Sequence, residues 1–214
     1  MTLDNFQYII SFDLEASCWR PSNYAKAEVI EIAAVFLNLK NGKIESEFHK
    51  FIRPTHHPIL SNFCVNLTGI TQSMIDRQET FPTVFNQFIS WLDNIRIEHG
   101  IHLTTPNQKS VKSGANATIC SWTDWDLLEF LPLDCKRNGI ECPDSLKAWI
   151  DVRKKYDQFY NSLRGMPFAR ALTKFNIDST GKDHSAIDNA KGLAQMVILL
   201  SDKGARFGEV TRAL

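Results

Sequence analysis

The chain has 214 residues, of which 43% are hydrophobic and 22% are charged, a composition typical of one globular domain with a substantial core. Its 24 Lys and Arg residues balance 24 Asp and Glu residues, so no overall basicity indicates nucleic acid, membrane surfaces or acidic partners. The five cysteines show no C-x-x-C spacing, the start MTLDNFQYII lacks the pattern of a signal peptide, and no apolar run approaches a membrane span. We therefore expect an intracellular protein, cytoplasmic or nuclear, with reduced thiols and no membrane contact.

Three consecutive strands are predicted in the first quarter of the chain. Residues 7–14, 29–37 and 46–53 are rich in β-branched and aromatic side chains, and NGK at 41–43 is a turn signal. From Pro82 onward, FPTVFNQFISWLDNI places apolar residues at helical spacing, with Thr80 as a cap. The polar stretch 96–116 that follows is predicted to be a long surface loop or insertion.

The second half alternates between the two kinds of element. ATICSW predicts a buried strand, TDWDLLEFLPLDCKRNG a helix, AWIDV a short strand, and residues 185–203 a last long helix. This order favours one α/β domain over residues 1–214, with its core at about 7–203 and a five-stranded mixed sheet flanked by helices.

Two acids interrupt the first strand. In YIISFDLEAS, Asp13 and Glu15 share one side, while Phe12, Leu14 and Ala16 share the other. Burying like charges side by side is costly unless a bound cation neutralises them, and hard divalent ions prefer carboxylate oxygen as a ligand. A structural ion pair with Arg or Lys accounts for the two acids equally well.

Two further segments carry candidate ligands. His184 and Asp188 lie four residues apart at the start of the last helix and can face one point, although a capping His followed by an exposed Asp has the same spacing. In SWTDWDLLEF, Asp124 and Asp126 follow a buried strand, where simple N-capping is the alternative for one of them.

The order of these motifs along the chain resembles that of the DEDDh 3′-to-5′ exonuclease family: Asp-x-Glu, then a later Asp, then His-x-x-x-Asp. The segments EVIEIAAV, FCVNLTGITQSMID and KDHSAIDNAKGLA are similar to its branch with the histone-mRNA 3′ exonuclease, the enhanced-RNA-interference exonuclease and Snipper. The resemblance covers most of residues 7–203 and implies the ribonuclease H-like fold. The stretch 96–116 is longer than this family pattern leads us to expect.

The resemblance also implies roles. Asp13, Glu15, Asp126 and Asp188 would bind two divalent metal ions, Mg²⁺ or alternatively Mn²⁺, and His184 would be the general base. Asp126 matches rather than Asp124 because it follows Trp125, as in the Trp-Asp pair of the family. The pocket for the terminal nucleotide would be framed by Leu14, Ala16, Phe63, Leu67, Thr68 and Trp125, with ordinary core packing as the alternative for Phe63 and Trp125.

The expected activity is hydrolysis of single-stranded RNA 3′ ends, and of DNA ends, to nucleoside 5′-monophosphates. The alternatives are a DNA-directed exonuclease and a catalytically silent nucleic-acid-binding module of the same fold. The basic run of Arg153, Lys154 and Lys155 is a candidate phosphate track, and a solvated helix face explains it equally well. No protein partner is indicated.

Overall fold

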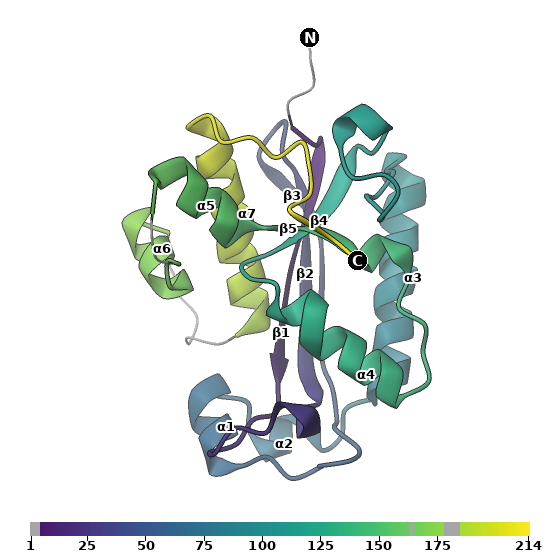
Figure 1. Cartoon of the computed structure of the whole chain (residues 1–214). Coiled ribbons are helices and arrows are strands. Elements are labelled where there is room, and N and C mark those ends of the chain that lie inside the picture. Colours follow the sequence, from purple (N-terminus) through teal and green to yellow (C-terminus); the bar gives the residue numbers. More distant parts are fainter. Residues whose placement is uncertain (1–4, 163–164, 178–184) are drawn as a thin grey trace.

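The computed structural model describes residues 5–162, 165–177 and 185–214 (Figure 1). Within them one mixed sheet has the strand order β3-β2-β1-β4-β5-β6. Neighbouring strands are antiparallel except for the two central pairs, β1 with β4 and β4 with β5, which are parallel. The strands are β1 (Tyr8–Ala16), β2 (Val29–Asn38), β3 (Lys43–Phe51), β4 (Ala117–Ser121), β5 (Ala148–Asp151) and β6 (Arg212–Ala213).

The expected mixed α/β architecture is confirmed, with one strand more than predicted. The additional strand β6 has two residues and pairs with the edge of β5. A segment this short carries no alternation of apolar and polar side chains, so periodicity alone gives no signal for it.

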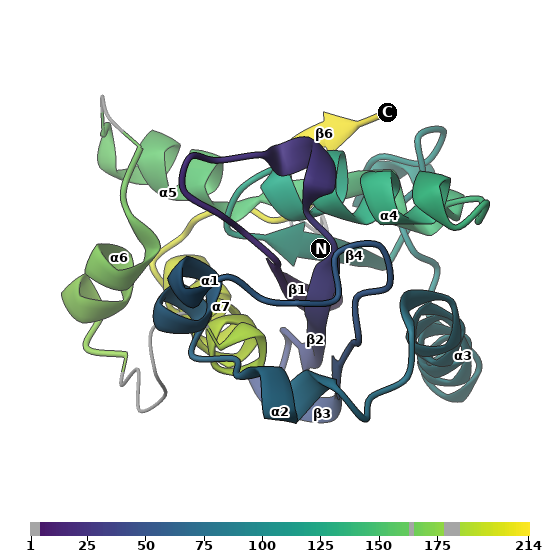
Figure 2. The same ribbon diagram turned by 90° about the horizontal axis from the view of Figure 1, so that it is seen from below.

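Helices cover both faces of the sheet. Helices α5 (Val152–Tyr160), α6 (Phe168–Lys174) and α7 (Ala186–Asp202) lie on one face, and α3 (Phe81–His99) and α4 (Leu131–Arg137) on the other (Figures 1 and 2). The short helices α1 (Asn62–Thr68) and α2 (Gln72–Ile75) lie at the end of the sheet where β1 finishes. No described helix is long and apolar enough to cross a membrane.

The central strand β1 divides its side chains between two cores. Ile10, Phe12 and Leu14 pack in the cluster on the α3 side, whereas Ile9 packs in the cluster on the α7 side. Because side chains alternate along a strand, Asp13 and Glu15 share the α7 face with Ile9. The alternation predicted from the sequence therefore places the two acids on the face of the sheet that α7 covers.

Helix α7 lies close to β1. The Ser11 hydroxyl donates to the Ala190 carbonyl oxygen at 2.7 Å, a bond that ties strand to helix inside the core. Ala186, Ala190 and Ala194, which recur at four-residue spacing, are fully buried. Small side chains at this spacing let the helix approach the sheet, so its first turn is held beside the acidic end of β1.

The segment expected to be a loop from residue 96 is partly helical. Helix α3 continues through His99, and Gly100 ends it with a left-handed backbone at φ 59°. Residues 100–116 then include a short 3₁₀ turn, Val111–Ser113, and bridges from Leu103 to Ala117 and from Ser110 to Glu209. The insertion therefore starts later than predicted and is tied to the sheet.

Candidate active site

Three carboxylates meet at the end of β1 that faces α7. Asp13 and Glu15 come from β1, and Asp126 opens a π-helical turn, Asp126–Phe130, that follows β4. The charges of Asp126 and Glu15 act on Asp13, and that of Asp126 also acts on Glu15. The parallel pairing of β1 with β4 places the end of β4 next to the end of β1, which explains why residues this far apart in sequence lie together.

A fourth carboxylate, Glu31, adjoins this group. In the register of β1 and β2, Glu31 lies directly opposite Glu15, and only 1% of its surface is exposed. One Glu31 oxygen is 2.6 Å from Nε2 of His49, and the other accepts the backbone N–H of Ala186 at 3.2 Å. Glu31 therefore anchors the first turn of α7, where a negative charge is also favoured by the helix dipole.

The grouping of acids raises their affinity for protons. Burial raises the pKa of Glu15 to about 9, and the charges of Glu31 and Asp126 add to that effect. Burial likewise raises the pKa of Asp126 to about 8. The pKa of Asp13 is well above its usual value, first because of burial and then because of Asp126 and Glu15. Carboxylates in this state repel one another when ionised and are stabilised by a cation.

The first turn of α7 reaches the same group. The side-chain amide of Asn189 donates to Asp13 at 3.2 Å, and the adjacent Asp188 is exposed. His184 lies outside the described residues, so its predicted role stays a prediction. The structure thus brings Asp13, Glu15 and Asp126 together and places Asp188 next to Asn189, which contacts Asp13.

The donor set fits a divalent cation by its chemistry. In the described part of the chain, no three Asp, Glu, His or Cys side chains are already grouped as a preformed metal site. The residues present are nevertheless carboxylates, which hard ions such as Mg²⁺ and Mn²⁺ prefer, and the groups that act on Asp13 and Glu15 include further acids but no Lys or Arg in the described part of the chain. A bound cation would relieve that repulsion.

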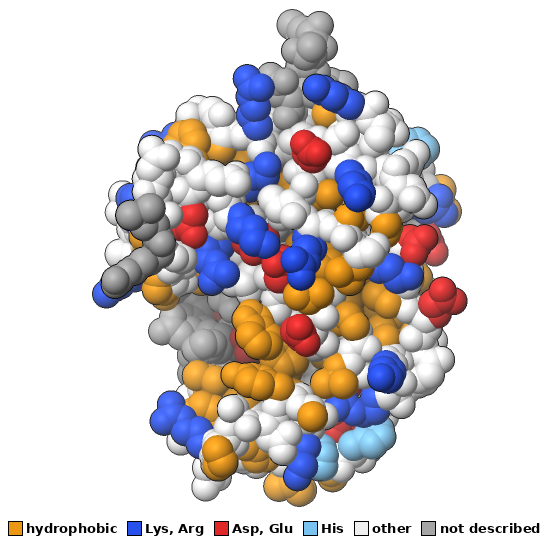
Figure 3. Space-filling view, in the orientation of Figure 1, with side chains coloured by type: hydrophobic (Ala, Val, Ile, Leu, Met, Phe, Trp, Pro, Cys, Tyr) orange, Lys and Arg blue, Asp and Glu red, His pale blue; other side chains and the backbone are white. Residues whose placement is uncertain are grey.

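A cavity of about 470 Å³ opens beside the carboxylates. Four of the six residues predicted to bind substrate line it, namely Leu14, Ala16, Phe63 and Leu67, and Glu15 joins them. In the space-filling view, apolar side chains gather next to a hollow near the end of β1 (Figure 3). A mostly apolar cavity that shares a wall with acids is suited to a base and sugar whose phosphate meets the acids.

The other two predicted contacts lie differently. Thr68 is buried, and its hydroxyl donates to the Cys64 carbonyl at 2.9 Å and accepts the Ile70 N–H at 3.1 Å, bonds that close the end of α1. Thr68 is not among the residues that line the cavity. Trp125 is 49% exposed, and its ring lies 6.1 Å from that of Phe130, tilted by 33°; Phe130 does line the cavity.

The neighbouring acid Asp124 makes structural contacts instead. Its two carboxylate oxygens accept Nε1 of Trp149 at 2.9 Å and Nζ of Lys154 at 2.7 Å. Asp124 is therefore occupied by structural contacts, which agrees with the choice of Asp126 as the candidate ligand. Lys154 is occupied as well, and this removes the middle residue of the basic run as a free phosphate contact.

Several residues of this region were missed by sequence reasoning. Glu31 interrupts the apolar run EVIEIAAV in the way that Asp13 interrupts its own, so the same argument applied to β2 finds it. Asn189 follows a candidate ligand directly. Tyr24 and Phe130 line the cavity, but they come from a 3₁₀ turn and a π-helical turn, which are too short for periodicity to mark them.

Comparison with known sequences shows the family to which the chain belongs. The profile of the Exonuclease family, RNase_T, matches residues 10–197. The 3′-5′ exonuclease Snipper of Drosophila melanogaster is 37% identical over 210 residues, 97% of this chain and 74% of the relative. ERI1 exoribonuclease 2 of Xenopus laevis is 38% identical over 193 residues, 89% of this chain but 28% of the relative. The chain thus spans about a third of the length of the ERI1 exoribonuclease 2 proteins that it matches.

Solved structures with a similar fold are also exonucleases. The nuclease domain of 3′hExo, described as a DEDDh family member bound to rAMP, matches with a TM-score of 0.84 and 29% identity, covering 98% of both chains. A 3′-exonuclease in 3′-end specific recognition of a histone mRNA stem-loop matches with a TM-score of 0.81 and 28% identity, over 97% of this chain and 86% of that one. With the acidic site in place and the profile covering most of the sequence, the chain belongs to the exonuclease family, and its structure is similar to that of a DEDDh member.

Proposed function

We propose that this chain is a metal-dependent 3′-to-5′ exonuclease acting on single-stranded RNA ends, with DNA ends as a second substrate. The observation that carries the proposal is the group of neighbouring carboxylates Asp13, Glu15 and Asp126, of which Glu15 lines the cavity beside β1. Relatives named as 3′-5′ exonucleases and exoribonucleases, and a structural neighbour bound to rAMP, support it.

Membership of the DEDDh group implies divalent metal ions. We infer that Asp13, Glu15, Asp126 and Asp188 would hold two of them, with Mg²⁺ as the resident ion and Mn²⁺ as a substitute. Such ions, when bound, supply a nucleophilic water near neutral pH and stabilise the charge on the leaving oxygen. Four carboxylates carry about four negative charges at full ionisation, which about balances two divalent cations.

Other residues would position the metal ligands and accept a proton. The Asn189 amide holds Asp13 in place, and Glu31 fixes the start of the helix that carries Asp188. His184, which the sequence places just before that helix, would accept the proton of the attacking water, a contribution of roughly 10²- to 10⁴-fold for a positioned base.

We infer that the cavity takes the 3′-terminal nucleotide. One nucleoside would fit between Leu14, Phe63 and Leu67 while the phosphate on its 5′ side meets the acids. Base stacking on Phe63 tolerates any sequence because every base has an aromatic face. A preference for RNA requires a contact to the 2′ hydroxyl, and the polar side chains of Ser22 and Asn23 in the cavity wall are candidates for it.

Matched RNA and DNA oligonucleotides test the proposal. Each carries a 5′ label and is incubated with the protein in Mg²⁺, Mn²⁺ or EDTA, and the products are resolved on a denaturing gel. We expect a ladder that shortens from the 3′ end only with metal, and faster for RNA. Faster cleavage of DNA would favour the DNA-directed alternative, and binding without cleavage would indicate a silent nucleic-acid-binding module.

A further inference from the structure

One loop reaches two walls of the cavity. Residues 19–26 are the middle of the connection between β1 and β2, and within them the guanidinium carbon of Arg20 lies 4.5 Å from the ring centroid of Phe63. The ring of Tyr24 lies 5.5 Å from that of Trp125, at an interplanar angle of 32°, and 6.5 Å from that of Phe130. The same loop therefore places a cation on one aromatic wall and an aromatic ring near another.

Both side chains also face the cavity itself. Arg20 and Tyr24 line it together with Glu15 and Phe63. The Tyr24 side chain is 58% exposed, so much of its ring is not covered by protein. Large aromatic groups left exposed at the edge of a cavity are suited to stacking on a planar ligand.

The stem of the loop is held by hydrogen bonds. The backbone N–H of Ser17 donates to the Glu28 carbonyl at 2.8 Å, and the N–H of Glu28 donates to the Ser17 hydroxyl oxygen at 3.0 Å. The Ser61 hydroxyl donates to the Cys18 carbonyl at 2.6 Å. Nη2 of Arg137 donates to the Ala25 carbonyl at 3.1 Å.

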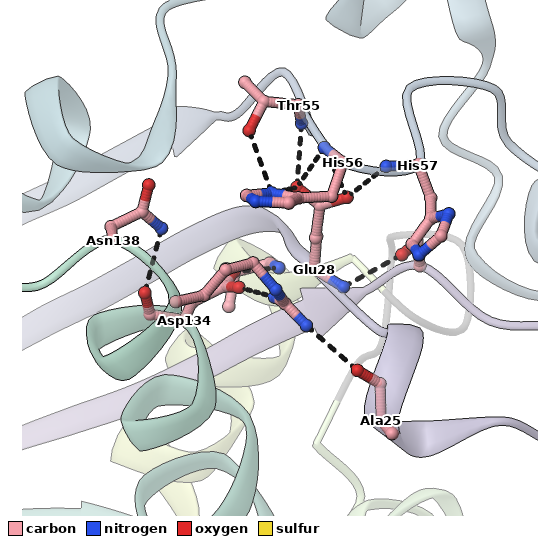
Figure 4. Close-up of polar contacts among 10 residues, drawn as sticks. Ala25, Glu28, Thr55, His56, His57, Asp134 and Asn138 are labelled. Carbon is pink, nitrogen blue, oxygen red and sulfur yellow. Dashed lines mark hydrogen bonds and ion pairs between the residues drawn. The ribbon is translucent and has the colours of Figure 1, made fainter.

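Glu28 extends this anchor to a second segment. Its carboxylate accepts the backbone N–H groups of Thr55 at 2.7 Å, His56 at 3.1 Å and His57 at 2.6 Å (Figure 4). The same hydrogen bonds keep the pKa of Glu28 below its usual value although burial opposes them. Both ends of the loop are thus fastened, while Arg20 and Tyr24 make their contacts at the cavity.

We propose that residues 19–26 form a specificity loop in which Arg20 and Tyr24 contact the terminal nucleotide. The Tyr24 ring stacks on the terminal base, and the Arg20 guanidinium, stacked on Phe63, donates hydrogen bonds to acceptors on the sugar or on the base edge. This inference rests on the proposed exonuclease function and adds two substrate-binding residues to it.

The proposed contacts are made in the ground state and in the transition state alike. Removing a contact of this kind raises KM and leaves kcat unchanged. Since base stacking contributes roughly 1 to 3 kcal/mol per base, Tyr24→Ala should raise KM for RNA by about 5- to 150-fold. Tyr24→Phe keeps the ring and should restore KM, whereas Arg20→Lys keeps the charge but loses the planar stack and should stay impaired.

The experiment compares these variants with Lys26→Ala as the matched control. Lys26 belongs to the same loop but lines a neighbouring cavity with His56 and His57 instead. Steady-state kinetics on a single-stranded RNA with a normal or an abasic 3′-terminal residue give KM and kcat. Isothermal calorimetry with rAMP measures binding to the same pocket without relying on turnover.

The expected result has three parts. Tyr24→Ala and Arg20→Ala raise KM and weaken rAMP binding, while Lys26→Ala changes neither. The effect of Tyr24→Ala disappears on the abasic substrate, because no base is left to stack, and a merely structural role of Tyr24 would not produce that difference.

Three other results would overturn the inference. Unchanged KM and rAMP affinity would exclude contacts to the nucleotide, and tighter binding in the variants would mean that the loop competes with the nucleotide. A fall in kcat alone would place the two residues in the chemistry. If the wild-type protein cleaves nothing, the proposed function fails separately, and rAMP affinity still decides the role of the loop.

Discussion

Without metal, the protein should lose stability as the pH rises through neutrality. The pKa of Glu15 rises from 4.5 to about 9 on folding, and that of Asp126 from 3.8 to about 8. Below about pH 3 both the folded and the unfolded state hold these protons, and the folded state is not penalised. At higher pH the unfolded chain releases the two protons while the folded chain keeps them. The free energy of unfolding therefore falls with rising pH until the pH passes the folded pKa values.

The size of the effect follows from the number of retained protons. Between pH 6 and pH 7 the folded chain keeps about one proton on each of Glu15 and Asp126, and each proton costs about 1.4 kcal/mol per pH unit. From these two groups alone the free energy of unfolding should therefore fall by about 2 to 3 kcal/mol over this interval, which lowers Tm by roughly 5 to 10 °C in a chain of this size, and the raised pKa of Asp13 acts in the same direction.

Urea or thermal unfolding in EDTA at several pH values measures this dependence. Glu15→Gln removes one of the titrating groups and should reduce the slope by about 1.4 kcal/mol per pH unit. Glu98→Gln, at an exposed position on α3, is the control and should leave the slope unchanged. Stability that stays constant or rises from pH 6 to pH 8, or an unchanged slope in Glu15→Gln, would refute the reasoning.

Further predictions concern metal, helix and base. Mg²⁺ at 100 times its Kd should add about 2.7 kcal/mol of stability, with tighter binding at pH 8 than at pH 6, and equal stabilisation of Asp188→Asn would contradict its role as a ligand. Glu31→Ala should lower kcat and destabilise by about 1 kcal/mol or more, whereas Glu31→Gln keeps an acceptor for the helix and should recover much of both in kinetic and unfolding assays. His184→Ala should slow cleavage about 10²- to 10⁴-fold and remove an ionisation near neutrality, and an unchanged pH–rate profile would exclude it as the base.

Local periodicity is enough to predict five of the six strands and to place two of the acids on one face. The alternation in YIISFDLEAS placed Asp13 and Glu15 together on one face, and the structure has them on the face that packs against α7. The same argument, applied to β2, would have found Glu31. The apolar run around Glu31 predicts a strand and gives no sign of what the acid contacts, and the structure shows that this acid, with 1% exposure, has His49 and the start of α7 as partners.

Features that depend on contacts distant in sequence were not predictable in this way. Helices α1 and α2 have seven and four residues, too few for a helical pattern of apolar positions to stand out. Thr68 was predicted to face the nucleotide, but its hydroxyl closes the end of α1. The positions of Arg20 and Tyr24 depend on bonds from Ser61 and Arg137 to the stem of their loop, and nothing in the local sequence encodes such bonds.

The most direct test of the account compares two acids that lie two residues apart. Asp126→Asn and Asp124→Asn are each incubated with 5′-labelled single-stranded RNA and Mg²⁺, and initial rates are measured after unfolding curves have shown that both variants fold. We predict that Asp126→Asn loses at least about a thousand-fold in rate, as expected when several kcal/mol of transition-state stabilisation disappear. Asp124→Asn should keep most of the activity, because this residue contacts Trp149 and Lys154 rather than the carboxylate group. Near-normal cleavage by Asp126→Asn would contradict the assignment of these carboxylates as the active site.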